Sequence, residues 1–545
     1  MPKRLLSVWR SRSPSSDERC DAANRLQDGL RPVSRAEAVD ESRRDLRSPA
    51  PRKGAVASFV ILIIFLFSGL RGAFLAVREP FFDDLFTVWI ARMPFREMMD
   101  ALRLDSGPPL YYLLVRLAVP LREGAAAIEL VERVRFFSFV IGFATLLVVL
   151  GARHLGNTRY VAALLFACFP PAMLFATEAR AYALCGLFAG LCAILLHRWS
   201  ETGRTVLLGF AVLFAVLAAW SHYYGVVLLP LPLVAGLFGQ GRKLIGRGVA
   251  AAISGSLLFI PGLMLALAQP RDAVRWMTVE SRDAPAILLS ALRQLGFAAS
   301  YPAALLEPMP AAAQLVSAAV IGLLFIFGVR RSTTARFFFA MTLAPVLFIA
   351  MIGLFREAAY FPLRFESVLS VPFTIAVGAS LLALTPKLRI AATMTLLVLA
   401  LLVTYASLMS AVRGSRDPFR EAAFATRSGL GTDAFILASG FSYLETISQA
   451  GDRWSPQIFA FPAEQARHPG WSRPADAETL ESELETLLPR LPPHFAWVGA
   501  RNSVELKTLT RRCASRPVHG TGPALIAILS CDPVPMRKDG EKLKQ

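Results

Sequence analysis

Long apolar segments are the feature that most restricts how this chain can fold. About eleven of them, each 16 to 23 residues long and nearly free of charge, lie between residues 55 and 409. A helix needs ~20 apolar residues to cross a hydrocarbon core of ~30 Å. Only 18% of the residues are charged, against roughly 25% in soluble domains. The sequence therefore excludes a soluble enzyme, a nucleic-acid-binding protein and a single-anchor protein, and it predicts a polytopic α-helical membrane protein.

Basic residues in the connections between these segments indicate how the chain threads the membrane. We expect spanning helices at 55–77, 134–151, 158–177, 181–199, 205–220, 224–240, 247–268, 311–329, 336–355, 364–384 and 389–409. Residues 1–53 hold 13 Lys and Arg against 8 Asp and Glu, and every second later connection is also basic. Such segments stay in the cytoplasm. We therefore predict a disordered cytoplasmic tail over 1–53 in a multi-pass membrane protein, with no nucleic-acid partner.

The same alternation predicts that residues 78–133 form one long external loop of a transmembrane domain over 54–409. The apolar stretch Leu110–Leu121 is short for a span, and counting it would invert every later connection. Within the loop, the apolar residues of Pro94–Leu104 recur at the i, i+3, i+4, i+7 spacing of an amphipathic helix that lies on a membrane surface.

Residues 410–545 contain no apolar segment of spanning length, and the alternation of loops places them on the periplasmic side. Helix-like stretches alternate there with strand-like ones, which favours a small α/β domain. The helix-like stretches are 418–427, 443–450 and 477–488, and the strand-like stretches are 434–438, 495–498 and 525–529.

Two cysteines of this region, Cys513 and Cys531, could form a disulfide. If 513–518 and 525–531 pair as an antiparallel hairpin centred on Gly522, the two cysteines stand opposite each other. Directly opposed residues approach to Cα separations of ~4.5 Å, which a disulfide tolerates. Two unpaired thiols on different elements are the alternative, and the sequence leaves both open.

Four polar clusters fall on the external face of the predicted topology. They are Phe81-Phe82-Asp83-Asp84, Asp105–Tyr112, Thr177–Tyr182 and Ser221–Gly225. Taken alone, each has a structural explanation: solvated loop charges, a Gly-Pro-Pro turn, helix-end caps and an interfacial aromatic anchor. Arg356, Arg364 and Glu366 lie near the external end of the tenth predicted span, where an ionisable group is a functional candidate.

Taken together and in this order, the clusters make the sequence resemble the GT-C superfamily of integral-membrane glycosyltransferases. It is similar to the bacterial branch related to protein O-mannosyltransferases and to the lipid A aminoarabinose transferase. The resemblance covers about 55–410 and is carried by Asp83-Asp84, Gly107-Pro108-Pro109-Leu110-Tyr111-Tyr112, Glu178-Ala179-Arg180-Ala181-Tyr182, His222-Tyr223-Tyr224 and Arg364-Phe365. The chain departs from the family pattern at three positions, because Asp84 replaces Glu, Gly107 replaces His or Lys, and Thr177 replaces Gln.

The resemblance implies transfer of a sugar from a polyprenyl-phosphate donor to a glycan, lipid or protein acceptor on the periplasmic side, with inversion. Asp83 and Asp84 are the implied catalytic residues, with Asp83 as the base that deprotonates the acceptor hydroxyl. Arg180 and Arg364 are expected to bind the donor phosphate through charge-assisted hydrogen bonds. The other expected substrate-binding residues are Pro108, Pro109, Tyr111, Glu178, Tyr182, His222 and Tyr223.

A divalent metal ion is the one cofactor that the motifs suggest, and no cofactor is certain. Asp83, Asp84, Glu178 and His222 could bind such an ion only if their loops converge. Gly107 has no side chain, so the phosphate or metal contact that a His or Lys would make at this position is missing.

A transporter or flippase of lipid-linked glycans is the alternative function. Transporters tend to carry ionisable residues near the bilayer midplane, on broken helices and in repeated halves. In this chain the charges gather at one predicted face, the apolar segments are mostly uninterrupted, and no convincing internal repeat is found. The pattern favours the transferase.

Overall fold

The computed structural model forms two compact units, Met1–Ile61 and Leu62–Gln545. It describes residues 53–78, 82–121, 127–239, 241–270, scattered positions between 285 and 297, 311–355, 364–414, 435–450, 457–463, 477–500, 502–519 and 524–531. In the first unit the described residues are the opening turns of helix α3 (Lys53–Val77). Everything below concerns the second unit.

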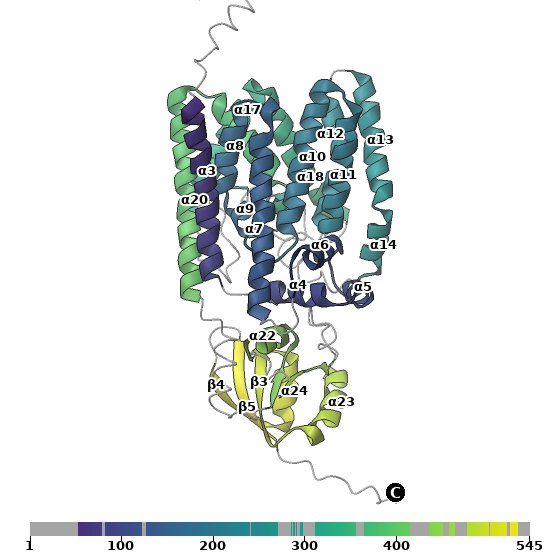
Figure 1. Ribbon diagram of the computed structural model, residues 1–545. Coiled ribbons are helices and arrows are strands. Elements are labelled where there is room, and N and C mark those ends of the chain that lie inside the picture. The colour runs from purple at the N-terminus through teal and green to yellow at the C-terminus, as the bar shows by residue number, and fades with distance from the viewer. Residues whose placement is uncertain are drawn as a thin grey trace, which may run out of the picture. The chain divides into compact units, whose positions relative to one another are not determined.

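Helices make up the part of the unit that precedes residue 415 (Figure 1). Among the described residues, six helices are long and apolar enough to cross a membrane: α3, α7 (Ala127–Gly151), α10 (Tyr182–Thr202), α17 (Ala311–Arg331), α18 (Thr333–Phe355) and α20 (Pro386–Gly414). Shorter apolar helices are α8 (Thr158–Cys168), α9 (Pro170–Phe175), α11 (Thr205–Ser221), α12 (Leu231–Phe238), α13 (Arg242–Leu258), α14 (Ile260–Ala268) and α19 (Ser370–Leu382). The predicted polytopic helical architecture is confirmed.

Each predicted span falls on one of these helices or on a consecutive pair of them, but several of the helices are short. The span predicted at 247–268 is bent by 47° between α13 and α14. The one predicted at 224–240 begins as the 3-10 helix η2 (Tyr223–Leu228) before it continues as α12. The count of eleven spans therefore stays a prediction.

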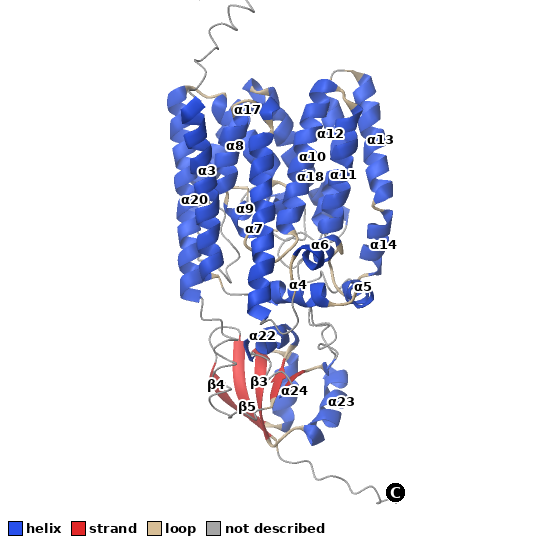
Figure 2. Ribbon diagram, viewed as in Figure 1, coloured by secondary structure: helices blue, strands red, loops and turns tan. Residues whose placement is uncertain are grey.

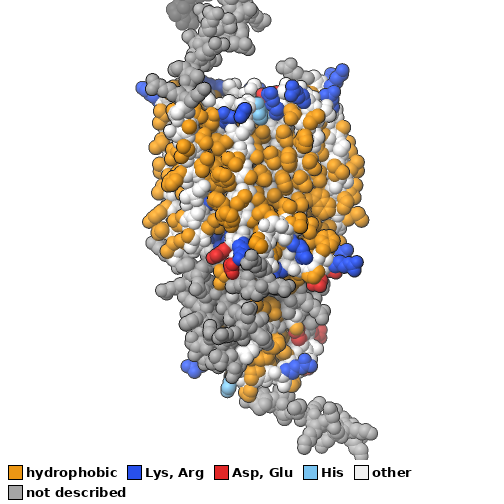
Figure 3. All heavy atoms as spheres, in the orientation of Figure 1, with side chains coloured by type: hydrophobic (Ala, Val, Ile, Leu, Met, Phe, Trp, Pro, Cys, Tyr) orange, Lys and Arg blue, Asp and Glu red, His pale blue; other side chains and the backbone are white. Residues whose placement is uncertain are grey.

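The outer surface of the helical part is a broad band of hydrophobic side chains (Figure 3). Large apolar side chains such as Leu267 and Leu315 are 77% and 70% exposed. Lys and Arg side chains gather at the upper edge of the band in this view. An apolar surface of this extent, bordered by charge, is typical of a protein that contacts lipid.

A break divides the third predicted span into α8 and α9, and a buried arginine of α3 bridges it. Pro170 and Pro171 have no N–H group, so the carbonyl oxygens of Phe166 and Ala167 lose their helical donors. The fully buried Arg71 supplies replacements, donating from Nη1 to Ala167 O at 2.8 Å and from Nη2 to Phe166 O at 3.4 Å. The break is stable because another helix satisfies the freed carbonyls.

The stretch predicted as an external loop folds into three short helices, α4 (Phe82–Arg92), α5 (Phe95–Arg103) and α6 (Leu110–Ala118). The nine residues of α6 span only ~14 Å, a length that fits the prediction that this stretch does not cross a bilayer. The expected amphipathic helix is α5, which buries Met98 and Leu102 and leaves Phe95 exposed. The loop is shorter than predicted, because α7 begins at Ala127, seven residues before 134.

Within the described residues, all strands belong to one five-stranded sheet near the C-terminus (Figure 2). Its order is β2-β1-β3-β5-β4, formed by β1 (Ile436–Ala438), β2 (Ile458–Ala460), β3 (His494–Ala500), β4 (Ala514–His519) and β5 (Ala524–Ser530). Strands β1, β2 and β3 are parallel, and β5 is antiparallel to β3 and β4. The helices of this region are α22 (Gly440–Ala450), α23 (Ala477–Leu487) and α24 (Val504–Arg512).

The small α/β fold predicted for this region is confirmed, although two of its elements were not predicted. These two elements are strand β2, which is only three residues long, and helix α24. The start of α24 could have been recognised in the sequence from its N-cap residue. Ser503 accepts a hydrogen bond from Leu506 N at 3.1 Å, which is the usual signature of a helix N-terminus. The helix predicted at 418–427 lies outside the described residues.

The predicted hairpin and its disulfide are both present. Strands β4 and β5 pair so that Ala514 faces Ser530, and each is eight residues from position 522, as the sequence argument required. The next pair outward is Cys513 and Cys531, which are disulfide-bonded with a Cα separation of 4.3 Å. The sequence left a disulfide and two unpaired thiols open, and the pairing of the two strands decides for the disulfide.

Candidate active site

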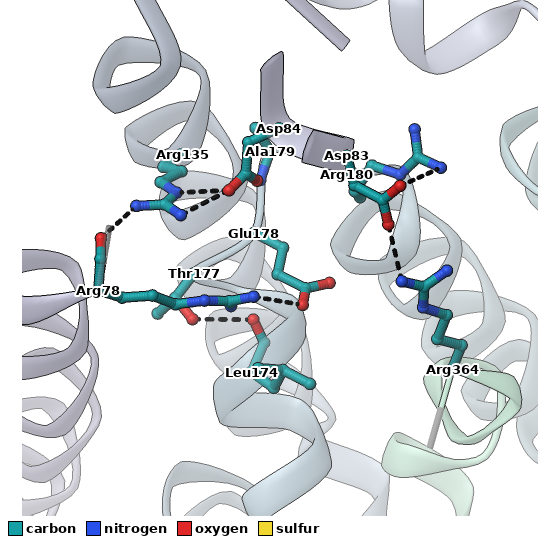
Figure 4. A network of polar contacts seen from close by, with 10 residues as sticks. All are labelled: Arg78, Asp83, Asp84, Arg135, Leu174, Thr177, Glu178, Ala179, Arg180 and Arg364. Atoms are coloured by element: carbon teal, nitrogen blue, oxygen red, sulfur yellow. Dashed lines mark hydrogen bonds and ion pairs between the residues drawn. The ribbon is translucent and has the colours of Figure 1, made fainter. Parts of the chain in front are cut away.

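The two adjacent aspartates at the start of α4 point in different directions (Figure 4). Consecutive residues on a helix are rotated by about 100°, so their side chains diverge. Asp84 is fully buried, whereas the Asp83 side chain is 15% exposed. The two aspartates look like one motif in the sequence, but their side chains lie in two different environments.

Asp84 lies in a buried network that joins three segments of the chain. Arg135 of α7 donates to Asp84 Oδ2 from Nε at 3.1 Å and also from Nη2. The backbone N–H of Ala179 donates to Asp84 Oδ1 at 2.7 Å. Arg135 also donates from Nη1 to the carbonyl oxygen of Arg78 at 2.6 Å. These contacts hold α4 against α7 and against the loop that carries Arg180.

Glu178 belongs to the same network, and Arg78 is its partner. The Arg78 guanidinium donates from Nη2 to Glu178 Oε1 at 2.9 Å, and the Glu178 side chain is fully buried (Figure 4). The sequence placed Glu178 among the substrate-binding residues. In the structure Glu178 lies beside Arg78, in the loop that also carries Arg180. It does not line the cavity of about 950 Å³ that Arg180 lines.

Asp83 faces two arginines that come from distant parts of the chain. Arg364 donates from Nη2 to Asp83 Oδ2 at 2.7 Å, and Arg180 Nη2 lies 3.6 Å from Asp83 Oδ1. Burial alone would raise the pKa of Asp83, but Arg180 and Arg364 outweigh it and lower this pKa below its usual value. Burial alone would likewise lower the pKa of Arg180, but Asp83 raises it well above normal. Both groups are therefore ionised.

These charges lie at one end of a cavity of about 950 Å³. The polar end is lined by Asp83, Asp105, Tyr112, Arg180, Tyr182, His222, Tyr223 and Arg364. The rest of the lining is mainly apolar and comes from η2, α13, α14 and α18, through Val226, Val227, Leu229, Phe259, Leu263, Ala266, Leu267, Phe348, Ile349 and Ile352. The cavity can therefore hold a ligand with a charged head and a long hydrocarbon chain.

His222 enters the cavity as a neutral ring. Burial, followed by the charges of Arg180 and Arg364, lowers its pKa to about 3. Its Nδ1 accepts a hydrogen bond from Tyr224 N at 3.2 Å, so the proton of the neutral ring is on Nε2. The ring centroid lies 5.1 Å from that of Tyr182 and 4.6 Å from that of Tyr224. The imidazole can donate a hydrogen bond to a ligand but carries no positive charge.

The turn before α6 adds further polar groups to the cavity. Asp105 is only 7% exposed, and the Tyr112 hydroxyl lies 3.5 Å from Arg180 Nη1. A Cβ atom at Gly107 would meet Asp105 Oδ2 and the Tyr112 hydroxyl at 3.5 Å, which is ordinary contact. Gln269, at the end of α14, donates from Nε2 to the Gly107 carbonyl oxygen at 3.1 Å and so fixes this turn.

The structure brings most of the predicted site residues together at this cavity. Those that line it are Asp83, Pro108, Arg180, Tyr182, His222, Tyr223 and Arg364. Those outside its lining are Asp84, Pro109, Tyr111 and Glu178. Pro109 is the residue before the first turn of α6, and the buried Tyr111 hydroxyl lies 2.8 Å from Ser138 Oγ. Arg356 lies outside the described residues.

Sequence reasoning did not select Arg78, Arg135 or Gln269, and it named Asp105 and Tyr112 only as members of a polar cluster. Two of them carry a signal that could have been used. Arg135 is a charge at the edge of an apolar segment, and Arg78 directly follows another such segment. A charged side chain at the depth of the membrane needs a partner of opposite charge. The acidic residues on the same predicted external face are the candidates for Arg78 and Arg135.

The proposed metal ligands do not converge on one point. Among the described residues, no group of three or more His, Cys, Asp and Glu side chains is close enough to hold a metal ion. Asp83, Asp84 and Glu178 each have an arginine as a near neighbour. The described residues therefore do not form a ready-made metal site, and we assign no reaction step to a metal.

No protein-family model and no curated protein matches the chain. Several solved structures do match it. ArnT from Cupriavidus metallidurans bound to undecaprenyl phosphate has a TM-score of 0.52 at 11% identity, over 87% of this chain and 98% of that one. Its apo form gives 0.53 at 12% over the same shares. AglB from Archaeoglobus fulgidus has a TM-score of 0.45 at 13% identity, over 82% of this chain and 69% of that one. The chain therefore shares the fold of these two ArnT structures.

Proposed function

We propose that this protein transfers a sugar from a polyprenyl-phosphate donor to an acceptor hydroxyl on the periplasmic side of the inner membrane, with inversion at the anomeric carbon. The observation that carries the proposal is the cavity, in which Asp83 and two arginines form a charged end next to an apolar arm. The likeness in fold to ArnT, whose structure holds undecaprenyl phosphate, supports it.

The donor fits the cavity in one orientation. Its isoprenoid chain lies along the apolar arm, where burial of hydrocarbon is favourable. Its phosphate lies between Arg180 and Arg364, whose guanidinium groups suit phosphate oxygens. The sugar then lies beside Asp83, with Tyr112, Tyr182 and the Nε2–H of His222 near enough to the same end to contact its hydroxyls.

Donor binding also changes the basicity of Asp83. In the empty cavity the two arginines depress its pKa, which makes the carboxylate a weak base. A phosphate between the arginines offsets part of their positive charge at Asp83, so the pKa of Asp83 rises. Asp83 then becomes a stronger base when the donor is in place.

The reaction needs one proton transfer and one bond exchange. In this proposal Asp83 separates from Arg364 when the donor binds, so that the sugar lies between the carboxylate and the phosphate. Asp83 takes the proton of the acceptor hydroxyl, and the acceptor oxygen forms a bond to the anomeric carbon on the face opposite the phosphate. The bond between the anomeric carbon and the phosphate oxygen breaks, and both of its electrons leave with the polyprenyl phosphate. Arg180 and Arg364 stabilise the charge on this leaving group, so a general acid is not required.

Asp84 and Glu178 act as positioning residues in this proposal. Asp84 binds the backbone of Ala179, directly before Arg180, and ties it to α7 through Arg135. Glu178 is held by Arg78 on the other side of the same loop. Together they determine where the Arg180 side chain can reach, which sets the distance between the phosphate and Asp83.

The test uses membranes labelled with a sugar precursor and the full-length chain. Purified protein in proteoliposomes should release polyprenyl phosphate from the labelled lipid-linked sugars, and the labelled sugar should appear on the acceptor. A transporter or flippase would move the intact lipid-linked sugar between leaflets and release no polyprenyl phosphate. Lipid movement without release would therefore replace the transferase by the transporter.

A further inference from the structure

A second cavity of about 530 Å³ lies at the other end of the helices that line the first one. Tyr182, the first residue of α10, lines the first cavity, and Thr202, the last residue of α10, lines the second. Twenty residues of helix separate the two positions, which is about 30 Å. The second cavity is therefore not part of the candidate active site.

Two cations of α13 line this second cavity. Lys243 and Arg247 are four residues apart, so they lie on the same face of the helix. Arg247 donates from Nη1 to the Gly203 carbonyl oxygen at 3.3 Å. Glu201 is the one carboxylate of the lining, and it is already within 3.2 Å of Arg198. The balance of charge around the cavity is positive.

A buried histidine in the lining has an unused polar atom. His197 is only 5% exposed, and its Nδ1 has no hydrogen-bond partner among the described residues. The nearest carboxylate oxygen, Glu201 Oε2, is 3.9 Å away, which is too far for a hydrogen bond. Phe337 and Phe338 pack against the ring with centroid distances of 4.9 and 5.1 Å, so the ring cannot easily turn away. An unsatisfied polar atom of this kind calls for a partner.

Two helix N-termini add partial positive charge. Lys243 belongs to the first turn of α13, and Thr333 is the first residue of α18. The residue that precedes α13 is Gly241, which has no side chain to cap the free N–H groups. Helix N-termini attract anions through such N–H groups and through the helix dipole.

We propose that this cavity binds the phosphate group of a membrane-lipid headgroup. Lys243 and Arg247 would bind the phosphate oxygens, and a headgroup hydroxyl would donate to His197 Nδ1. The cavity lies where apolar helices end, which is the level of lipid headgroups in a bilayer. Phe238, Leu244 and Phe337 add apolar lining for the start of the lipid chains. Free phosphate shares the same chemistry, and the proposal does not depend on the function of the first cavity.

The experiment titrates the delipidated full-length chain in detergent with phosphatidylglycerol and counts bound lipid by native mass spectrometry. Lys243→Gln/Arg247→Gln removes both cations of the cavity. Arg242→Gln/Lys387→Gln is the matched control, because it removes the same charge from two basic residues that do not line the cavity. We expect the first variant to bind the lipid roughly fivefold more weakly for each cation removed, and the control to bind like the wild type.

Equal lipid binding by the two double variants would overturn the proposal. Lys243→Gln alone changes one exposed side chain and should fold normally, so a single loss of about fivefold keeps the test decisive if the double variant is unstable. In a parallel arm, inorganic phosphate replaces the lipid and the thermal unfolding midpoint is compared with chloride at equal ionic strength. Stabilisation by phosphate that Lys243→Gln/Arg247→Gln abolishes, together with equal lipid binding by the two double variants, would overturn the lipid headgroup and make a soluble phosphate the ligand.

Discussion

At the scale of single residues, the main finding is that two neighbouring carboxylates have different surroundings. Asp83 faces the cavity and two arginines, while Asp84 is buried against Arg135 and the Ala179 backbone. A sequence motif of two acidic residues suggests a shared role, such as a metal site or a base and its helper. The rotation of about 100° per helical residue separates them.

The first prediction compares the two aspartates. Asp83→Asn should lower the turnover of sugar transfer by ~10²–10⁴-fold, because a general base contributes about that factor. The binding of undecaprenyl phosphate should persist, since the arginines are unchanged. Turnover and lipid binding of the purified variant are to be measured together. Near-normal turnover would remove Asp83 from the role of base.

Asp84→Asn is the matched control at the neighbouring position. It should lower thermal stability, because breaking a buried ion pair costs about 3–5 kcal/mol. The surviving folded fraction should bind undecaprenyl phosphate more weakly, since the loop that carries Arg180 loses a contact. A variant that is inactive but fully stable, with normal lipid binding, would instead place Asp84 in the chemistry.

The second prediction concerns pH. Asp83 must be ionised to act as a base, and Arg180 and Arg364 lower its pKa. The acid limb of kcat/KM should therefore lie below the ordinary Asp value of ~3.9. Arg364→Gln removes a charge that favours the ionised form, so the pKa of Asp83 rises and the limb moves to higher pH. A pH profile of both proteins tests this, and an unmoved limb would mean that another group titrates.

At the scale of elements, the break between α8 and α9 shows how the bundle tolerates irregular backbone. Two prolines remove two N–H donors, and one arginine from another helix replaces them. The short helix α9 then leads into the loop that presents Arg180. The break between α8 and α9 is therefore part of how the site is built.

The third prediction tests this bridge. Arg71→Leu removes the donor of the Ala167 carbonyl group and one of the two donors of the Phe166 carbonyl group, which keeps a bond from Phe169 N at 3.4 Å. Leaving the Ala167 carbonyl unsatisfied should cost about 1–3 kcal/mol. The thermal unfolding midpoint of the purified variant should fall. Pro170→Ala/Pro171→Ala restores the missing N–H groups, so it should recover much of the loss in the Arg71→Leu background. No recovery in the combined variant would mean that Arg71 acts through something other than these carbonyls.

At the scale of the whole molecule, the open question is on which side of the membrane the sheet domain lies. The alternation of basic loops predicts the periplasm for residues 410–545. The disulfide between Cys513 and Cys531 agrees with an oxidising compartment, because such bonds persist there and are rare in the cytosol. The basic loops and the disulfide therefore lead to the same expectation, that residues 410–545 lie in the periplasm.

The fourth prediction uses the disulfide to test that topology. In native membranes, Cys513 and Cys531 should react with an alkylating reagent only after denaturation and reduction. A Cys513→Ser variant should expose a single reactive thiol at Cys531 without reductant. Alkylation of both cysteines in the unreduced, denatured wild type would contradict both the bond and the periplasmic location.

The sequence by itself determined what depends on local pattern. A membrane core leaves backbone N–H and C=O groups without water, so long apolar segments must be helical. The helical architecture, the amphipathic helix α5 and the small α/β fold follow from such periodicities. The sequence also suggested the register of the β4–β5 hairpin, because its partners lie 18 residues apart around one turn, but it left open whether Cys513 and Cys531 are bonded.

Only the tertiary structure decided which polar groups meet. Asp83 and Arg364 are 281 residues apart, and Asp84 and Arg135 are 51 apart. No local rule pairs residues at such separations, because the pairing depends on how whole helices pack. The same holds for Arg71 and the helix break, and for Gln269 and the turn at Gly107. Motifs indicated which residues to examine, and packing decided which carboxylate faces the cavity, because helix rotation and neighbouring helices determine where each side chain points.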